Sequence, residues 1–175
     1  MDKRIRIISD SEGKNIVLIS DIRFKGKRKI DWKEVEKYLK EYIGECYEVI
    51  ETSDKVFINS EFPGELKGSE DTKRLFGTNA KAKANATQGI PMLIRCATNR
   101  RWQENVKTKH NVNAKFGWYR YTTRFALPVY NSNTDELERF NVFRIEMLIR
   151  HAADGNLYLY DMVNIKKETS TPLEQ

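Results

Sequence analysis

The sequence predicts an α+β fold: an N-terminal ββαββ portion, two consecutive helices, and then a C-terminal three-stranded antiparallel meander. Two observations lead to this prediction. Residues 118–167 are rich in branched and aromatic side chains separated by short polar turns, as in adjacent antiparallel strands. Apolar residues recur at helical spacing between residues 32 and 43, and alanine is concentrated between residues 80 and 86.

The chain has 175 residues, enough for one domain with a sizeable core. We therefore expect a single domain over residues 1–175, with the hairpin of residues 1–24 at its periphery and a flexible tail at residues 168–175. The formal net charge of +6 favours an acidic partner, nucleic acid first. There is no membrane-length apolar run and no apolar signal-peptide centre, so we expect no membrane partner and a cytoplasmic location.

The N-terminal portion is predicted from turn residues and a helix cap. Residues 4–8 and 16–20 read as a hairpin around a Ser/Asp/Glu/Gly turn. Asp31 is a favourable N-cap, and Glu34 follows it at capping-box spacing, so a helix is expected to begin at Trp32 and to end at Gly44.

The middle of the chain is predicted to contain a hairpin, a polar loop and two helices. Residues 46–50 and 55–59 form the hairpin, and residues 65–77 read as a loop. An alanine-rich helix follows, and Pro91 is placed to open a second helix. The only cysteines, Cys46 and Cys96, have no metal-binding spacing and are predicted to be free, buried thiols.

The meander is predicted at residues 124–130, 138–151 and 157–167, and its second turn sets a register. If Gly155 takes the left-handed position of a three-residue turn, three apolar pairs result: Ile149 with Leu159, Ile145 with Val163 and Phe143 with Ile165. The other face then carries Arg144, Glu146, Leu148 and Arg150 opposite Asn164, Met162, Tyr160 and Tyr158. Arginine pairs with phosphate and tyrosine offers a stacking plane, although alternating charge is also typical of a strand's solvated side.

Residues 100–124 interleave basic and aromatic side chains, a mixture that suits single-stranded nucleic acid. Anchoring of a long loop by the aromatic rings is the alternative. Together with the meander face, this segment supplies the predicted nucleic-acid contacts: Arg100, Arg101, Lys109, Lys115, Trp118, Arg120, Tyr121, Arg144 and Tyr158.

No phosphate-binding glycine loop, dinucleotide fingerprint, nucleophile elbow or zinc-protease motif is present in the sequence, so we expect no cofactor and no metal. Acid–base chemistry without a metal remains, in which a titratable group moves a proton and cations stabilise a charged transition state. The candidate catalytic residues are His110, Arg124, Arg150, His151 and Tyr160. Structural roles are the alternative for both histidines, His151 as a half-buried strand end and His110 as a surface residue.

The alanine-rich run of residues 79–85 and the meander with Leu159-Tyr160-Asp161 in its last strand resemble uncharacterised domains carried by polyvalent proteins of phages and conjugative elements. Helices followed by a meander are also similar to the barnase/EndoU/colicin/RelE nuclease-like group. That resemblance implies a mobile-genetic-element protein of ribonuclease-like fold that binds RNA in preference to DNA, or cleaves it as a metal-independent endoribonuclease. The alternative is a non-catalytic accessory domain that binds nucleic acid or a host or element protein.

Overall fold

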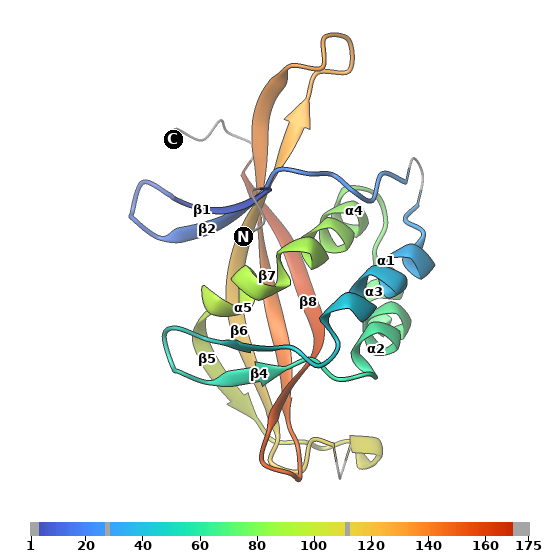
Figure 1. Ribbon diagram of the computed structural model, residues 1–175, viewed down its shortest axis with the longest axis vertical. Helices are drawn as coiled ribbons and strands as arrows, with labels where there is room; N and C mark the ends of the chain where they lie inside the picture. Colours follow the sequence, from blue (N-terminus) through green and yellow to red (C-terminus); the bar gives the residue numbers. More distant parts are fainter. Residues whose placement is uncertain (1–3, 27–28, 111–112, 170–175) are drawn as a thin grey trace.

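A computed structural model describes residues 4–26, 29–110 and 113–169 of the chain, and it confirms the predicted α+β class (Figure 1). The helices are α1 (Trp32–Leu39), α2 (Phe62–Gly68), α3 (Glu70–Arg74), α4 (Gly77–Ala86) and α5 (Ile90–Arg95), with 3-10 turns η1 (Lys40–Tyr42), η2 (Thr87–Gly89) and η3 (Thr108–His110). The strands are β1 (Ile5–Ser9), β2 (Asn15–Ile19), β3 (Cys46–Glu48), β4 (Lys55–Phe57), β5 (Thr98–Gln103), β6 (Trp118–Tyr130), β7 (Leu137–His151) and β8 (Leu157–Thr169).

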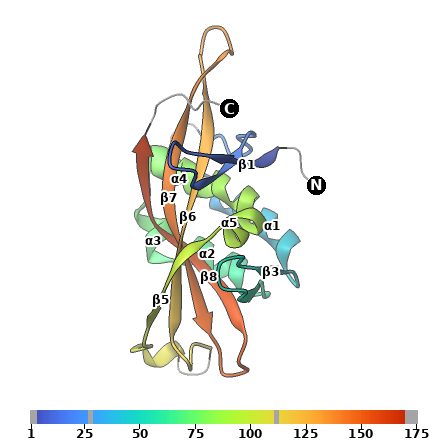
Figure 2. The ribbon, with the colours of Figure 1, turned by 90° about the vertical axis from the view of Figure 1, so that its left-hand side faces the viewer.

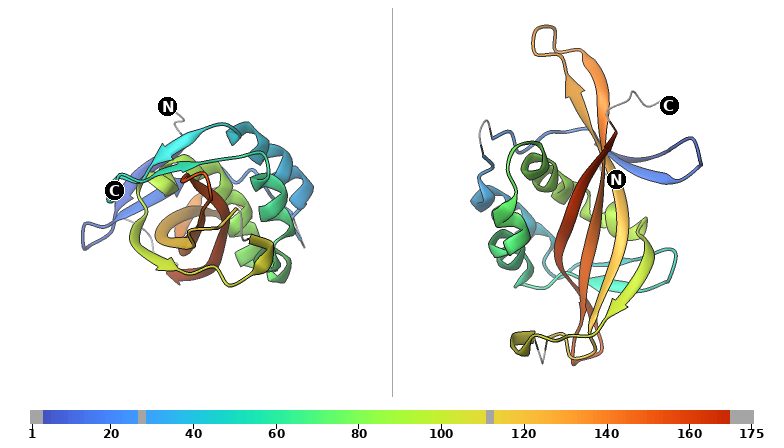
Figure 3. Two further views of the ribbon diagram at one scale, coloured as in Figure 1. Left: turned by 90° about the horizontal axis from the view of Figure 1, so that it is seen from below. Right: turned by 180° about the vertical axis from the view of Figure 1, so that it is seen from behind.

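Within the described residues the strands form one mixed sheet of eight, in the order β1-β2-β6-β7-β8-β4-β3, with β5 paired to β6. The long strands β6, β7 and β8 run along the molecule, and their lower ends curl when seen from below (Figure 3, left). The helices lie against one face of the sheet. From behind, most helices lie to the left of the long strands (Figure 3, right). We call the side of the long strands that faces away from the helices the open face.

The strands of the first half of the chain are built into this same sheet rather than into a separate portion. β2 pairs in parallel with β6, and β4 pairs in parallel with β8. Ile16 to Ile19 of β2 are buried, and β1 forms the edge of the sheet beside β2. β5 occupies the lower part of the same edge of β6 (Figure 2).

The predicted register between β7 and β8 is right at the turn and wrong farther along the strands. Ile149 faces Leu159 and Arg150 faces Tyr158 as expected, but Glu146 faces Val163, and Phe143 faces Lys167. Irregularities at residues 142–143, 144–146 and 148–149 shift the pairing, because a bulge adds residues to one strand only. The prediction assumed an uninterrupted ladder.

Residues 65–77 are not the predicted loop, because they contain most of α2 and all of α3. Phe62 and Leu66 of α2 are fully buried, and this burial outweighs the polar composition of the segment. Ser69 caps α3 by accepting a hydrogen bond from the Thr72 N–H, in agreement with the N-cap preference of serine.

Three smaller predictions are settled by position in the fold. Asp31 caps α1 by accepting a hydrogen bond from the Lys33 N–H, as expected. Both cysteines are free, but Cys46 is exposed on the outermost strand β3 and Cys96 is half-buried, so neither is fully buried. Of the predicted flexible tail, residues 168 and 169 belong to β8, and residues 170–175 lie outside the described part of the chain.

α4 is buried on almost every side, which explains its alanine-rich sequence. Its small side chains allow close packing in the core. There the Asn85 side chain supplies hydrogen-bond partners to the backbone of Phe24. The Asn85 amide accepts a hydrogen bond from the Phe24 N–H and donates one to the Phe24 carbonyl, both at 3.0 Å.

Lys83 of α4 is a fully buried cation held by two carboxylates. Its Nζ lies 2.9 Å from Asp71 Oδ2 of α3 and 3.0 Å from Asp161 Oδ1 of β8. The Lys83 side chain is 0% exposed. A buried ammonium is tolerated only when it is paired and hydrogen-bonded, so this triad joins the helix layer to the sheet.

Replacing Lys83 with alanine should lower the free energy of unfolding by about 3–5 kcal/mol, because the buried carboxylate of Asp161 loses its counter-ion. Urea denaturation of the purified variant measures this change. Lys81→Ala, on an exposed position of the same helix, should stay within about 0.5 kcal/mol of the wild type. A Lys83→Ala variant as stable as its Lys81→Ala control would contradict the role assigned to the triad.

Candidate nucleic-acid interface

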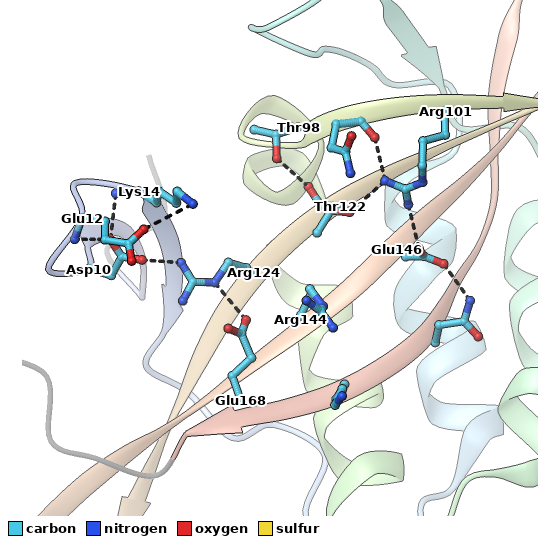
Figure 4. Close-up of a pocket in the computed structure, with 13 residues that line it drawn as sticks. Asp10, Glu12, Lys14, Thr98, Arg101, Thr122, Arg124, Arg144, Glu146 and Glu168 are labelled. Atoms are coloured by element: carbon cyan, nitrogen blue, oxygen red, sulfur yellow. Dashed lines mark hydrogen bonds and ion pairs between the residues drawn. The ribbon is translucent and has the colours of Figure 1, made fainter.

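A polar groove of about 810 Å³ lies on the open face, between the β1–β2 turn and β5 (Figure 4). Its floor comes from alternate residues of β6, β7 and β8, because side chains of one parity share one face of a strand. We call it the cationic groove after its basic residues, Lys14, Arg101, Arg124, Arg144 and Lys166. Four carboxylates also line it: Asp10, Glu12, Glu146 and Glu168.

Three of these cations occupy one rung across three neighbouring strands. Arg124 of β6 faces Arg144 of β7, and Arg144 faces Lys166 of β8. Like charges directly opposite one another destabilise a sheet, so such a row requires anions nearby.

Carboxylates neutralise only the Arg124 end of this rung. The Arg124 guanidinium lies 2.7 Å from Asp10 Oδ2 and 2.9 Å from Glu168 Oε1. The hydrogen bond from Arg124 holds the pKa of Asp10 below its usual value. Arg144 and Lys166 are exposed, and neither makes an ion pair or a side-chain hydrogen bond within the described residues. They form the unneutralised part of the groove.

The lower margin of the groove is held by Glu146, which serves two guanidinium groups. Glu146 Oε2 lies 2.6 Å from Arg101, and Oε1 lies 3.2 Å from Arg120. The Asn164 amide donates to the same carboxylate at 2.7 Å. Glu146 is therefore engaged by other donors, and within the described residues it forms no ion pair with Arg144 or Lys166.

Two asparagines of the groove have left-handed backbones, Asn99 with φ of 58° and Asn164 with φ of 56°. Residues other than glycine occupy this region infrequently, and asparagine is among those that tolerate it best. The Asn164 N–H donates a hydrogen bond to Asp71 of α3, and the Asn99 N–H donates one to Glu51. Tertiary contacts thus hold both backbones in place.

Farther down the open face, three predicted site residues meet. The His110 ring centroid lies 5.0 Å from that of Trp118 and 5.4 Å from that of Tyr160. Burial lowers the pKa of His110, although its hydrogen bond with Asn113 opposes this effect. His110 is 8% exposed, so it is not the surface residue that one alternative expected.

Arg150 lies beside this group in a buried acidic setting. Its side chain is 4% exposed, with Nη2 at 3.6 Å from Glu61 Oε2 and 4.0 Å from Glu65 Oε1. Its Nη1 donates to the Asn113 carbonyl, and its guanidinium lies over the Tyr158 ring. Among the described residues neither carboxylate oxygen of Glu65 has a hydrogen-bond partner. Burial raises the pKa of Glu65 to about 7, against the opposing charge of Arg150.

Three predicted site residues lie on the helix side and are not part of the open face. Tyr121 is fully buried, with its hydroxyl bonded to Asp54 and Thr52, so its predicted contact with nucleic acid is wrong. Arg100 forms an ion pair with Asp54. His151 packs on the rings of Phe116 and Tyr119. Their positions follow from the odd-numbered face of β6, which meets the core.

The structure therefore sorts the remaining candidates into two places on one face. Arg101, Arg124 and Arg144 line the cationic groove, and Arg120 joins its margin. The lower group comprises His110, Trp118, Tyr160, Lys109, Arg150 and Tyr158. Lys115 lies apart, over the ring of Phe116. His110 and His151 lie on different sides of β6 and do not form a pair.

Sequence reasoning missed Lys14, Lys166 and Glu65. For Lys166 a signal existed, since it lies within the predicted last strand, but the assumed register placed Asn164 rather than Lys166 opposite Arg144. Lys14 reaches the groove only because the β1–β2 turn lies beside β6. Glu65 had no signal, because its segment was predicted to be a loop.

No protein-family model, curated protein or solved structure matches this chain. None of the helices in the described ranges has the length and apolar character needed to cross a bilayer. Across the described ranges, no cluster of three or more histidine, cysteine, aspartate or glutamate side chains is arranged to hold a metal ion.

Glu65 should make stability depend on pH between about 4.5 and 7. The unfolded chain ionises Glu65 near pH 4.5, but the folded chain does so only near pH 7, so folding takes up a proton between these values. Stability is therefore lost as pH rises through this window. The full effect is about 3 kcal/mol for a shift of this size.

Urea denaturation at pH 5 and pH 8 measures this contribution as the difference between the wild type and Glu65→Gln, which cannot ionise. His110, whose pKa is lowered in the folded protein, makes stability rise with pH. This contribution is the same in both proteins, so it cancels in the difference. Glu45→Gln, an exposed carboxylate, serves as the control. An identical pH dependence in Glu65→Gln and the wild type would show that Glu65 ionises normally in the folded protein.

Proposed function

We propose that this chain binds single-stranded nucleic acid along its open face, with a phosphate held between Arg144 and Lys166. One observation carries the proposal: three cations share a rung, and carboxylates reach only the first of them. A bound phosphate would relieve the repulsion between Arg144 and Lys166, and the planar guanidinium of Arg144 can donate two parallel hydrogen bonds to it.

The carboxylates of the groove favour a single strand over a duplex. They lie beside the rung, on the β1–β2 turn, at the end of β8 and on β7, where a second phosphate backbone would meet them. Repulsion from these groups confines an anionic ligand to the strip beside Arg144 and Lys166. The net charge of +6 adds long-range attraction for such a polyanion.

RNA is the expected ligand, and a mobile genetic element is the expected source of the chain. Both expectations rest on the resemblance of the alanine-rich run and the meander to domains of phage and conjugative-element proteins. Binding to a host or element protein is the competing function, and its response to salt separates it from nucleic-acid binding.

The affinity for single-stranded RNA should fall with salt in proportion to the phosphates that Arg144 and Lys166 neutralise. For two phosphates the expected slope of log K against log[salt] is about −1.4, equal to about a sevenfold loss between 50 and 200 mM salt. Fluorescence anisotropy of a labelled oligonucleotide measures this slope. In the Arg144→Ala/Lys166→Ala variant it should become shallower by about 1.4.

The matched control is Lys33→Ala/Lys37→Ala, which removes the same charge from exposed positions of α1. This control should keep the wild-type slope. Equal slopes of log K against log[salt] in the groove variant and the control would show that the cationic groove does not contact the RNA. Affinity that does not change with salt would favour a protein partner.

Metal-independent RNA cleavage is a second candidate, favoured by the grouping of His110, Tyr160 and Arg150 at one end of the open face, with Glu65 of α2 beside Arg150. In such a reaction the 2′-oxygen forms a bond to phosphorus while the bond from phosphorus to the 5′-oxygen breaks. The 2′-hydroxyl proton passes to a base, and an acid gives a proton to the 5′-oxygen. His110 would exchange the proton, and Arg150 would stabilise the charged phosphorane.

Incubation of labelled single-stranded RNA with the protein in EDTA tests this candidate on a denaturing gel. The expected product ends in a cyclic phosphate, and His110→Asn should slow its formation by about 100-fold or more. His151→Ala should retain the rate, because His151 lies on the other side of β6. RNA that stays intact at micromolar protein would eliminate cleavage and leave binding as the function.

A further inference from the structure

The open face has a small cavity of about 190 Å³ at its lower end, which we call the aromatic pocket. His110, Trp118 and Tyr160 line it, and their ring planes meet at 90°, 90° and 80°. Three nearly perpendicular rings form a corner, and none is stacked on another. A flat ligand stacked on one ring would present its edge to the other two rings. Stacked and edge-to-face contacts are both favourable geometries for aromatic rings.

Two rings of the pocket are held by hydrogen bonds before any ligand arrives. His110 Nδ1 lies 3.0 Å from Asn113 Oδ1, and Trp118 Nε1 donates to Asn105 Oδ1 at 3.2 Å. Tyr160 lies at the irregularity of β8, where Leu148 pairs with Asp161 and Ile149 pairs with Leu159. Tyr160 therefore has no cross-strand partner, and a bulge of this kind redirects a side chain. A preorganised site of this kind binds with a smaller entropic cost.

The charge around the pocket decides between two kinds of ligand, an uncharged flat ring and an organic cation. Perpendicular aromatic rings also suit an organic cation, as in cages for methylated ammonium groups. Here three cations line the pocket, Lys107, Lys109 and Arg120, against one carboxylate, Glu104. This balance repels a cation and favours an uncharged ring that is attached to phosphate.

The aromatic pocket and the cationic groove lie along the same strands. Leu148 in the pocket and Arg144 in the groove are four residues apart on one face of β7, about 13 Å at the usual rise of a strand. Arg120 links the two, because it lines the pocket and forms an ion pair with Glu146 of the groove. A ligand lying along β7 can therefore contact both places.

We propose that the aromatic pocket receives one unstacked nucleobase of the strand whose phosphate lies on Arg144 and Lys166. This inference rests on the proposed function and deepens it: the ligand is recognised by a base as well as by its backbone. The cavity is smaller than the roughly 300–1,000 Å³ of pockets for drug-sized ligands, so it suits one ring system. The Gln103 side chain lines the pocket without a partner in the described part of the chain, and its amide offers a donor and an acceptor to the base edge.

The test compares two hexamers of equal charge, an oligoadenylate and an abasic ribose-phosphate chain, by fluorescence anisotropy with the full chain. The oligoadenylate should bind the wild type about 5- to 150-fold more tightly, the contribution of one stacked base. Tyr160→Leu should remove this difference and leave the affinity for the abasic hexamer unchanged. The control is Phe76→Leu, because Phe76 is an aromatic residue away from the pocket that is 83% exposed. This variant should preserve the difference in affinity between the two hexamers.

A second measurement needs no variant, which matters if Tyr160→Leu does not fold. A hexauridylate with one 2-aminopurine should lose fluorescence on binding to the wild type, because its uridine neighbours stack weakly on the fluorophore and an aromatic ring of the pocket quenches it. Equal affinities for both hexamers, with salt dependence retained, would overturn the base pocket and leave the groove. Binding of neither hexamer at low salt would overturn the proposed function itself. Tight binding of a trimethyl-lysine peptide, lost in Tyr160→Leu, would assign the pocket to a cation instead.

Discussion

The buried ammonium of Lys83 is the constraint on which the arrangement of the two layers depends. α4 is enclosed by the core, so this charge has no access to water and must find carboxylates within the protein. Asp71 comes from α3 and Asp161 from β8, which fixes the positions of a short helix and a long strand relative to α4. The small alanine side chains of α4 permit the close approach that these contacts need.

β8 departs from regular pairing next to Asp161, the residue that reaches Lys83. Asp161 is opposite Leu148 in the ladder, yet its side chain points to Lys83 in the helix layer. The pairing is irregular on either side of this point. On one side the Tyr160 side chain lines the aromatic pocket, and on the other Asn164 has a left-handed backbone at the cationic groove. Both candidate binding places thus lie where the pairing of β7 with β8 is irregular.

Charge on the open face is arranged by strand neighbours rather than by abundance. Asp10 and Glu168 neutralise one end of the cationic rung, and Glu146 binds the guanidinium groups below it. The positive field is thereby concentrated at Arg144 and Lys166. An interface built in this way attracts a polyanion in general and positions a single phosphate in particular, while the aromatic pocket supplies contacts that a bare phosphate chain cannot use.

The sequence by itself determined what local rules control. Turn residues and β-rich runs predicted the hairpins and long strands, Asp31 predicted the start of α1, and alternation placed Arg144 on the face away from the core. The turn at Gly155 also predicted the pairing of Arg150 with Tyr158, because register holds over the few residues nearest a turn.

Only the tertiary structure decided the rest, because it depends on which distant groups must be buried or paired. Two shifts in the pairing of β7 with β8, at residues 148–149 and 144–146 of β7, brought Lys166 opposite Arg144. Burial of Phe62 made a helix from a polar segment and carried Glu65 to Arg150. No local pattern contains these contacts, since each joins residues that are far apart in the chain, and their energies appear only when the layers pack.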